Sequence, residues 1–183
     1  KFDGCYHGHS DSLLVAAGQW WRLLTCVFVH IGIFHLAFNM YALLSVSSFL
    51  ESEIGSARYL SVFLLSGLGG SAASILLHVR VVSAGASGAI FGLIGFAISH
   101  FRRRGGAGSL EIRAFMIRWA AYAFVFGLLV RADNAAHAGG FAAGFLIGSV
   151  MEIREDARRR LAPVWTGIAS VLCAAAGLGF FLL

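Results

Sequence analysis

A serine and a histidine stand at the starts of two short apolar segments, and together they could carry out acyl transfer. Ser87 lies in the sequence GASG at residues 85–88, and His137 lies in AHAGG at residues 136–140. A serine hydroxyl becomes a nucleophile when a base takes its proton, and histidine is the usual base near neutral pH. Taken singly, each residue has a plainer interpretation as a hydrogen-bonded group inside a helix bundle. Their joint presence favours the catalytic interpretation.

Glycines recur at four-residue spacing after both residues. Gly88 and Gly92 follow the serine, and Gly140 and Gly144 follow the histidine. Small residues at this spacing let two helices approach closely. We therefore expect the two segments to pack along these glycines and to bring the serine and the histidine together. Phe91 lies one turn after the serine and could stack on the imidazole, unless it serves only core or lipid packing.

A second pair of polar residues occurs earlier in the chain. His35 and Asn39 are four residues apart, so they share one face of a helix. They could form a structural hydrogen-bond pair, or they could donate hydrogen bonds to an oxyanion beside the free backbone N–H of Ser87 at a helix N-terminus. His30, near the outer interface, is expected to hold a loop.

No acidic third member and no metal site is predicted. Asp133 precedes His137 by one turn, but we expect it to be solvated in a short loop. The sequence therefore predicts a Ser–His dyad. Cys5, His7 and His9 have poor spacing for metal ligands and lack a fourth ligand, so neither a metal nor another cofactor is expected.

The composition indicates the environment in which these residues act. Of 183 residues, 58% are hydrophobic and 13% are charged, against about 25% charged in a typical soluble domain. Such a chain is too apolar to be disordered and too poor in charge for an ordinary soluble domain. We predict an all-α polytopic membrane protein, in which the 23 glycines serve close helix packing.

The lengths of the apolar segments point to a water-filled pit. A spanning helix needs about 20 residues, and the two segments that begin with Ser87 and His137 are shorter than that. A helix that starts below the membrane surface must face protein or water at its buried end. The segments are expected at 27–50, 58–78, 86–101, 113–130, 136–151 and 163–183.

The basic residues indicate the orientation. The net charge is +5, and the basic residues lie at the ends of apolar segments, which indicates contact with membrane lipids and no nucleic-acid partner. Ten fall on one side and four on the other, so the first side is expected to be cytoplasmic and Ser87 and His137 to lie toward the outer face. The ten are Arg58, Arg102, Arg103, Arg104, Arg113, Arg118, Arg154, Arg158, Arg159 and Arg160; the four are Lys1, Arg22, Arg80 and Arg131.

These motifs resemble those of rhomboid intramembrane serine proteases. The similar stretches are GASG at 85–88, AHAGGFAAG at 136–144, HLAFN at 35–39 and the Trp-Arg pair at 21–22, and the resemblance covers about residues 18–151. It implies that Ser87 is the nucleophile and His137 the general base. It also implies an oxyanion hole formed by His35, Asn39 and the Ser87 N–H. The supporting residues would be Gly85, Gly88, Phe91, Gly140 and Gly144.

The resemblance also implies a domain layout. Residues 1–26 would form an outer loop with the Trp-Arg pair, 27–151 the catalytic bundle, and 163–183 an additional C-terminal transmembrane helix. Rhomboids have a helix before the Trp-Arg loop, whereas residues 1–19 here are polar. We therefore expect that first helix to be missing from this chain.

The function implied is that of a serine endopeptidase that cleaves single-pass transmembrane proteins near the outer ends of their helices. The expected location is the plasma (inner) membrane, with the active site opening to the outer side. The alternative is a catalytically silent rhomboid-like protein that binds membrane clients; its sign would be loss of the serine or the histidine, and both are present. A small transporter or channel is a third possibility, but the segments show no inverted repeat.

Overall fold

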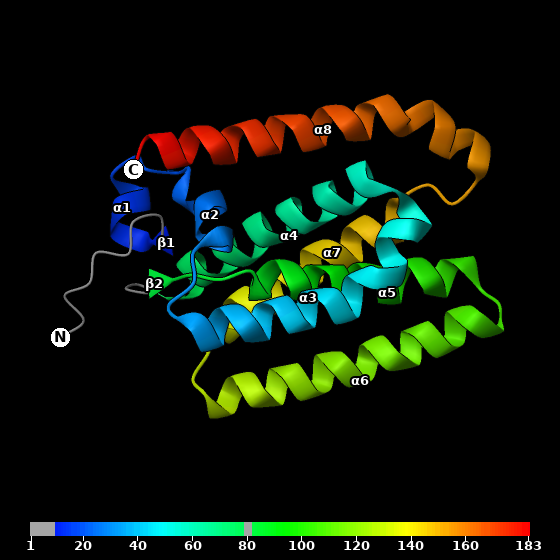
Figure 1. Cartoon of the computed structure of the whole chain (residues 1–183), viewed down its shortest axis with the longest axis horizontal. Coiled ribbons are helices and arrows are strands. Elements are labelled where there is room, and N and C mark those ends of the chain that lie inside the picture. Colours follow the sequence, from blue (N-terminus) through cyan, green and yellow to red (C-terminus); the bar gives the residue numbers. More distant parts are fainter. Residues whose placement is uncertain (1–9, 79–81) are drawn as a thin grey trace.

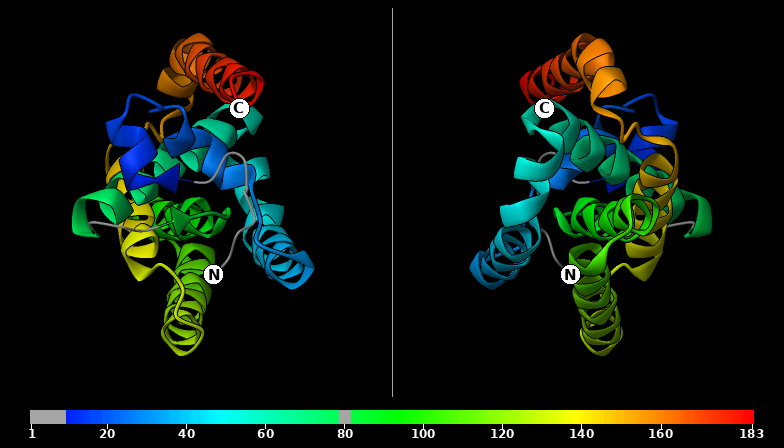
Figure 2. Two further views of the ribbon diagram at one scale, coloured as in Figure 1. Left: turned by 90° about the vertical axis from the view of Figure 1, so that its left-hand side faces the viewer. Right: turned by 90° about the vertical axis from the view of Figure 1, so that its right-hand side faces the viewer.

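Two central helices, α5 (Ser87–Arg104) and α7 (Asn134–Val150), pack side by side, and the other long helices surround them. The computed structural model describes residues 10–78 and 82–183. α8 (Glu155–Phe181) lies along one side of the molecule and α6 (Ala107–Leu129) along the opposite side, with α4 (Ser56–Leu77), α5 and α7 between them (Figure 1; end-on in Figure 2). The remaining elements are β1 (Ser10–Asp11), α1 (Ser12–Ala16), α2 (Arg22–Thr25), the 3-10 helix η1 (Cys26–Phe28), α3 (Ile33–Ile54) and β2 (Val82–Ser83).

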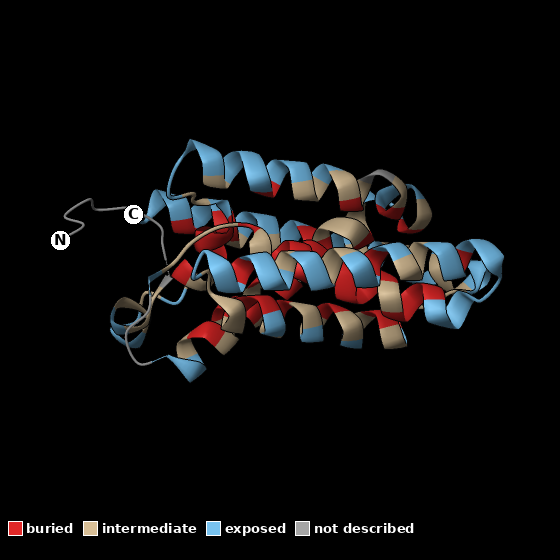
Figure 3. Cartoon of the chain, turned by 90° about the horizontal axis from the view of Figure 1, so that it is seen from below, coloured by how far each residue is buried: buried red, intermediate tan, exposed pale blue. Residues whose placement is uncertain are grey.

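The predicted all-α membrane fold is confirmed. Among the described residues, α4, α6 and α8 are each long and apolar enough to cross a membrane, and the bent pair Arg22–Phe28 and Ile33–Ser47 would make a fourth span. Buried residues gather on the inner helices, whereas the outer faces are exposed and apolar (Figure 3). Exposed apolar side chains suit contact with lipid, where they lose nothing by remaining outside the protein core.

Glycine sets the distance between α5 and α7. Gly140 and Gly144 lie directly on the backbone carbonyls of Gly88 and Gly92, so that no β-carbon would fit between them. Further along the pair, a β-carbon at Gly148 would lie only 2.6 Å from the carbonyl oxygen of Phe96. The two backbones are thus in contact over most of the length of α7, as the glycine spacing predicts.

The first long segment differs from the prediction. The apolar run predicts one helix over residues 27–50, but the chain turns by 90° between η1 and α3, and α3 begins at Ile33. His30 lies in the turn, where its Nδ1 is 3.2 Å from the carbonyl oxygen of Phe28 and its ring is 5.2 Å from that of His35. A polar side chain that bonds a backbone carbonyl stabilises a turn in place of a helix. His30 therefore lies in a turn, as its expected role in a loop requires.

The last helix also starts earlier than its apolar stretch. α8 begins at Glu155 and not at residue 163. Charged residues form its first turns, and an apolar run marks only the part of the helix that follows them. The Arg159–Glu155 pair, with 3.0 Å between Nε and Oε1, has the spacing that stabilises a helix surface. Glu152, which lies before the helix, accepts hydrogen bonds from Arg58 Nε at 2.7 Å and Trp165 Nε1 at 2.9 Å. This buried acceptor ties α8 to α4.

The arginine run at the end of α5 is mostly engaged within the protein. Arg103 donates to the carbonyl oxygens of Gly148 and Met151, at 3.1 and 2.6 Å, which the end of α7 leaves without helical partners. Arg104 forms an ion pair with Glu53. Two of the three arginines of this run, Arg103 and Arg104, thus hold helix ends together.

Replacing Gly144 with alanine should destabilise the fold. The added methyl group would overlap the backbone carbonyl of Gly92, which cannot move away cheaply. We expect the free energy of unfolding in detergent to fall by about 1–3 kcal/mol. Gly177→Ala is the matched control, because a β-carbon there meets nothing within 4 Å and alanine favours helix by about 1 kcal/mol. Equal shifts in the two variants would contradict the close contact.

Candidate active site

Ser87 and His137 meet at the beginnings of the two central helices. Ser87 is the first residue of α5, and His137 lies in the first turn of α7. The distance between Ser87 Oγ and His137 Nε2 is 2.9 Å. The ring of Phe91 stacks on the imidazole, with 4.4 Å between ring centroids and 17° between planes. His137 is buried, with 5% of its surface exposed, so the serine, the phenyl ring and the surrounding helices hold its orientation.

The second imidazole nitrogen has a partner that sequence reasoning missed. Asn134 Oδ1 lies 3.0 Å from His137 Nδ1. The spacing in the sequence indicates this contact, because Asn134 and His137 are three residues apart and such residues lie on the same face of a helix. The predicted dyad rests on the lack of an acidic residue at this place, where the chain has an amide.

The prediction that Asp133 is a solvated loop residue is wrong. Only 17% of its side chain is exposed. One carboxylate oxygen accepts from the backbone N–H of Ala136 at 3.1 Å, which caps the start of α7, and the other accepts from Ser74 on α4. His78 Nδ1 lies 4.0 Å from the carboxylate. Asp133 thus fixes the first turn of α7 to α4; its tertiary partner on α4 was not foreseeable from local spacing.

His35 and Asn39 lie beside the loop that leads to Ser87. The backbone N–H of Ile31 donates to His35 Nδ1 at 3.4 Å, so the neutral ring carries its proton on Nε2. That nitrogen faces Gly85: a β-carbon there would be 2.8 Å from it. Asn39 is buried and donates one amide N–H to the carbonyl oxygen of His35 at 2.8 Å. His35 therefore presents a donor to the space near Ser87, while Asn39 supports the turn of α3 that carries it.

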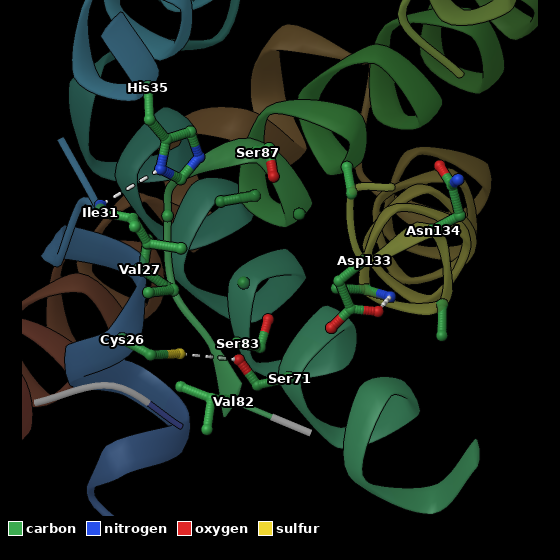
Figure 4. A pocket seen from close by; sticks show the side chains of 18 of the residues that line it. Cys26, Val27, Ile31, His35, Ser71, Val82, Ser83, Ser87, Asp133 and Asn134 are labelled. Atoms are coloured by element: carbon green, nitrogen blue, oxygen red, sulfur yellow. Dashed lines mark hydrogen bonds between the residues drawn. The ribbon is translucent and has the colours of Figure 1, made fainter. Parts of the chain in front are cut away.

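The serine opens onto a cavity of about 710 Å³ (Figure 4). Its walls include the start of α5, the loop before α7, His35, and a polar pair formed by Cys26 Sγ and Ser71 Oγ at 3.1 Å. A cavity of this size can hold several side chains of a peptide. α5 and α7 both start at this cavity and are short, at 18 and 17 residues, which agrees with the pit that the segment lengths predict.

The Trp-Arg pair, Trp21 and Arg22, lies beside the C-terminal end of α8. Arg22 is buried and donates from Nε to Gln19 Oε1 at 2.6 Å. A β-carbon at Gly179 would be 3.1 Å from the β-carbon of Trp21, so this part of α8 packs closely on the pair. Cys5, His7 and His9, considered above as metal ligands, lie outside the described residues, as do Lys1 and Arg80 of the charge argument.

This arrangement has the parts that acyl transfer requires. The Ser87 hydroxyl is hydrogen-bonded to an imidazole nitrogen of His137. The backbone N–H of Ser87 is at the first position of a helix and therefore has no intrahelical acceptor. The Nε2–H of His35 is a second donor near the same point. Two donors beside a nucleophile can stabilise the negative oxygen of a tetrahedral intermediate.

Comparison with known proteins finds similarity to rhomboid proteins. The family model for the Rhomboid domain matches residues 17–153. RHOMBOID-like protein 1 of Arabidopsis thaliana is 39% identical over 79% of this chain and 38% of its own length. Rhomboid protease GluP of Bacillus subtilis is 37% identical over 94% of this chain and 33% of its own length. Inactive RHOMBOID-like protein 8 of Arabidopsis thaliana is 33% identical over 73% and 39%. The chain thus spans between a third and two fifths of these relatives.

Gly85→Ala should disturb the site and the fold together. Gly85 has a φ of +124°, and its β-carbon would be 2.6 Å from His35 Cε1. We expect unfolding in detergent to cost about 1–3 kcal/mol less, from backbone strain, with an added loss from displacement of His35. Gly55→Ala, at a φ of +84° in open space, carries the strain alone. Gly85→Ala should therefore be the more harmful in a thermal unfolding assay; the reverse order would argue against the His35 contact.

Proposed function

The chain belongs to the rhomboid family, and from that premise we propose that it is an intramembrane serine endopeptidase that cleaves single-pass transmembrane proteins. The observation that carries the proposal is the 2.9 Å contact between Ser87 Oγ and His137 Nε2 at a cavity inside a membrane protein. GluP, a relative that covers nearly all of this chain, is named a rhomboid protease. Both support acyl transfer to water as the reaction.

In the proposed mechanism, Ser87 Oγ attacks the scissile carbonyl carbon while its proton passes to His137 Nε2. The carbonyl oxygen becomes an oxyanion, which accepts hydrogen bonds from the Ser87 N–H and His35 Nε2–H, with Asn39 holding His35 and offering its second amide N–H. The intermediate collapses, the C–N bond breaks, and the imidazolium gives its proton to the leaving amine. Water then attacks the acyl-enzyme, again with His137 as base, and releases the acid and free Ser87.

The substrate must unfold locally before it reacts. In a helix the scissile carbonyl is bonded to a backbone N–H and is shielded by its neighbours. The cavity lies at the end of the molecule where α5 and α7 begin, so a substrate would reach it with the end of its helix. Residues that weaken helix there should favour cleavage. Membrane lipids surround both partners.

The charge distribution supports an orientation. Arginines concentrate at the ends of α5 and α7 that lie away from the cavity, which we assign to the cytoplasmic side. The cavity would then open to the outer side of the plasma (inner) membrane. The division into an outer loop at 1–26, a catalytic bundle at 27–151 and an additional helix at 163–183 remains a prediction.

The alternative is a catalytically silent protein that binds membrane clients. One relative carries the word inactive in its name, so similarity to the family does not decide the matter. The bonded Ser87–His137 pair favours the protease, because a binding role needs no base beside a serine.

Removing either member of the pair should abolish cleavage. The protein would be reconstituted in liposomes with a single-pass test substrate, and cleavage would be followed on gels. Ser87→Ala and His137→Ala should lower the rate by at least about 10³-fold, since neither group works without the other. Ser149→Ala is the matched control, because this half-buried serine lies on α7 away from the cavity and its hydroxyl donates to the carbonyl oxygen of Leu146 in its own helix.

A fluorophosphonate probe gives a second readout. Ser87 should be the labelled residue, and labelling that survives Ser87→Ala would assign the reactive serine elsewhere. Cleavage that continues undiminished in both variants would sink the protease proposal and favour the silent alternative.

A further inference from the structure

We propose that Asn134 is a positioning residue that sets the tautomer of His137; this rests on the proposed function and extends it. The imidazole is engaged at both nitrogens, by Asn134 Oδ1 at 3.0 Å from Nδ1 and by Ser87 Oγ at 2.9 Å from Nε2. The three side chains thus form one continuous hydrogen-bonded row. The row runs from the first residue of α7 to the first residue of α5.

The chemistry requires one of the two neutral tautomers. His137 can take the proton of Ser87 only if Nε2 is unprotonated, so the ring must carry its hydrogen on Nδ1. An amide oxygen facing Nδ1 accepts that hydrogen and favours this tautomer. If the amide were turned to present its N–H group, the hydrogen would move to Nε2, and the ring would donate to the serine and could not act as its base.

Hydrogen bonds around Asn134 hold the backbone turn that carries it. The residue follows Asp133, whose carboxylate caps α7 and accepts a hydrogen bond from Ser74 on α4. The backbone N–H of Asn134 donates to the carbonyl oxygen of Ala132 at 2.9 Å. These three hydrogen bonds restrict the turn from which the Asn134 side chain extends toward the imidazole.

A glycine on a third helix leaves the space that the row occupies. A β-carbon at Gly127 of α6 would lie 2.8 Å from Asn134 Oδ1 and 3.4 Å from His137 Nδ1. α6 therefore covers the Asn134–His137 hydrogen bond with a glycine, which has no side chain to press against that bond. The amide is the end of a flexible side chain, so a methyl group at Gly127 would move the amide more readily than it would move a helix.

The tautomer can be measured without any catalytic assay. Protein with ¹⁵N-labelled histidine in detergent micelles would be studied by NMR, with His137→Gln to assign the signals. The parent should show the hydrogen on Nδ1 of His137. Asn134→Ala should shift the ring toward the Nε2–H tautomer, and Asn134→Asp, which still accepts at this position, should keep Nδ1–H. A parent with its hydrogen on Nε2, or an Asn134→Ala variant with an unchanged tautomer, would overturn the proposal.

Kinetics provide the second test. Asn134→Ala should lower kcat by about 10- to 100-fold with little change in KM, less than the roughly 10⁴-fold loss from a wrong tautomer in a Ser-His-Asp triad. Asn134→Asp should recover most of the loss, and its failure to recover any would count against the proposal. Gly127→Ala should lower kcat in the parent but add little in the Asn134→Ala background. Gly108→Ala, an α6 glycine with open space around it, is the control.

The two proposals fail in different ways. If the parent does not cleave, or if Ser87→Ala cleaves equally well, the protease function is wrong, while the NMR measurement still decides the role of Asn134. If the parent cleaves through Ser87 and Asn134→Ala changes neither kcat nor the tautomer, the function stands and the positioning role is wrong.

Discussion

The contact between the backbones of α5 and α7 is the constraint on which the rest of the molecule depends. Gly140 and Gly144 rest on the carbonyls of Gly88 and Gly92, so the distance between the helix axes and the register along them are both set by atoms that cannot adjust. Backbone contact of this kind replaces the hydrophobic driving force that is missing between helices in lipid. Ser87 and His137 stand at the same end of that contact, and their hydrogen bond follows from its register.

Polar groups at the other end of the molecule serve the same constraint. Arg103 bonds the last carbonyls of α7, and Arg104 pairs with Glu53 at the end of α3. Glu152 links α8 to α4 through Arg58 and Trp165. At the cavity end, Asp133 ties α7 to α4 through Ser74. The helices are thus tied at both ends, so that the glycine contact between them is held over its length.

Much of this arrangement could be read from the sequence, because it rests on patterns that are local. The small-residue spacing predicts which helices touch, and the short segments predict a cavity at their starts. The bend before Ile33 and the early start of α8 could not be predicted from apolar runs, since a turn bond from His30 and charged helical turns leave no mark in hydropathy. Asp133 was misjudged because Ser74, its partner on α4, is distant in sequence. Asn134 could be predicted from the sequence, because it lies three residues before His137 on one helix and an amide oxygen can accept from the imidazole as a carboxylate does.

Residue 134 is an amide and not a carboxylate, and this has a consequence for the charge of the cavity wall. A carboxylate in the place of Asn134 could also accept from the imidazole, but it would add a second negative charge to a cavity wall that already carries Asp133. An amide keeps the same acceptor geometry without a net charge. The row from Asn134 to Ser87 therefore rests on hydrogen bonds, and neither Asn134 nor Ser87 brings a fixed charge to the reacting atoms. One atom, the nitrogen that an amide has in place of a carboxylate oxygen, thus keeps a second anion away from the base of the serine.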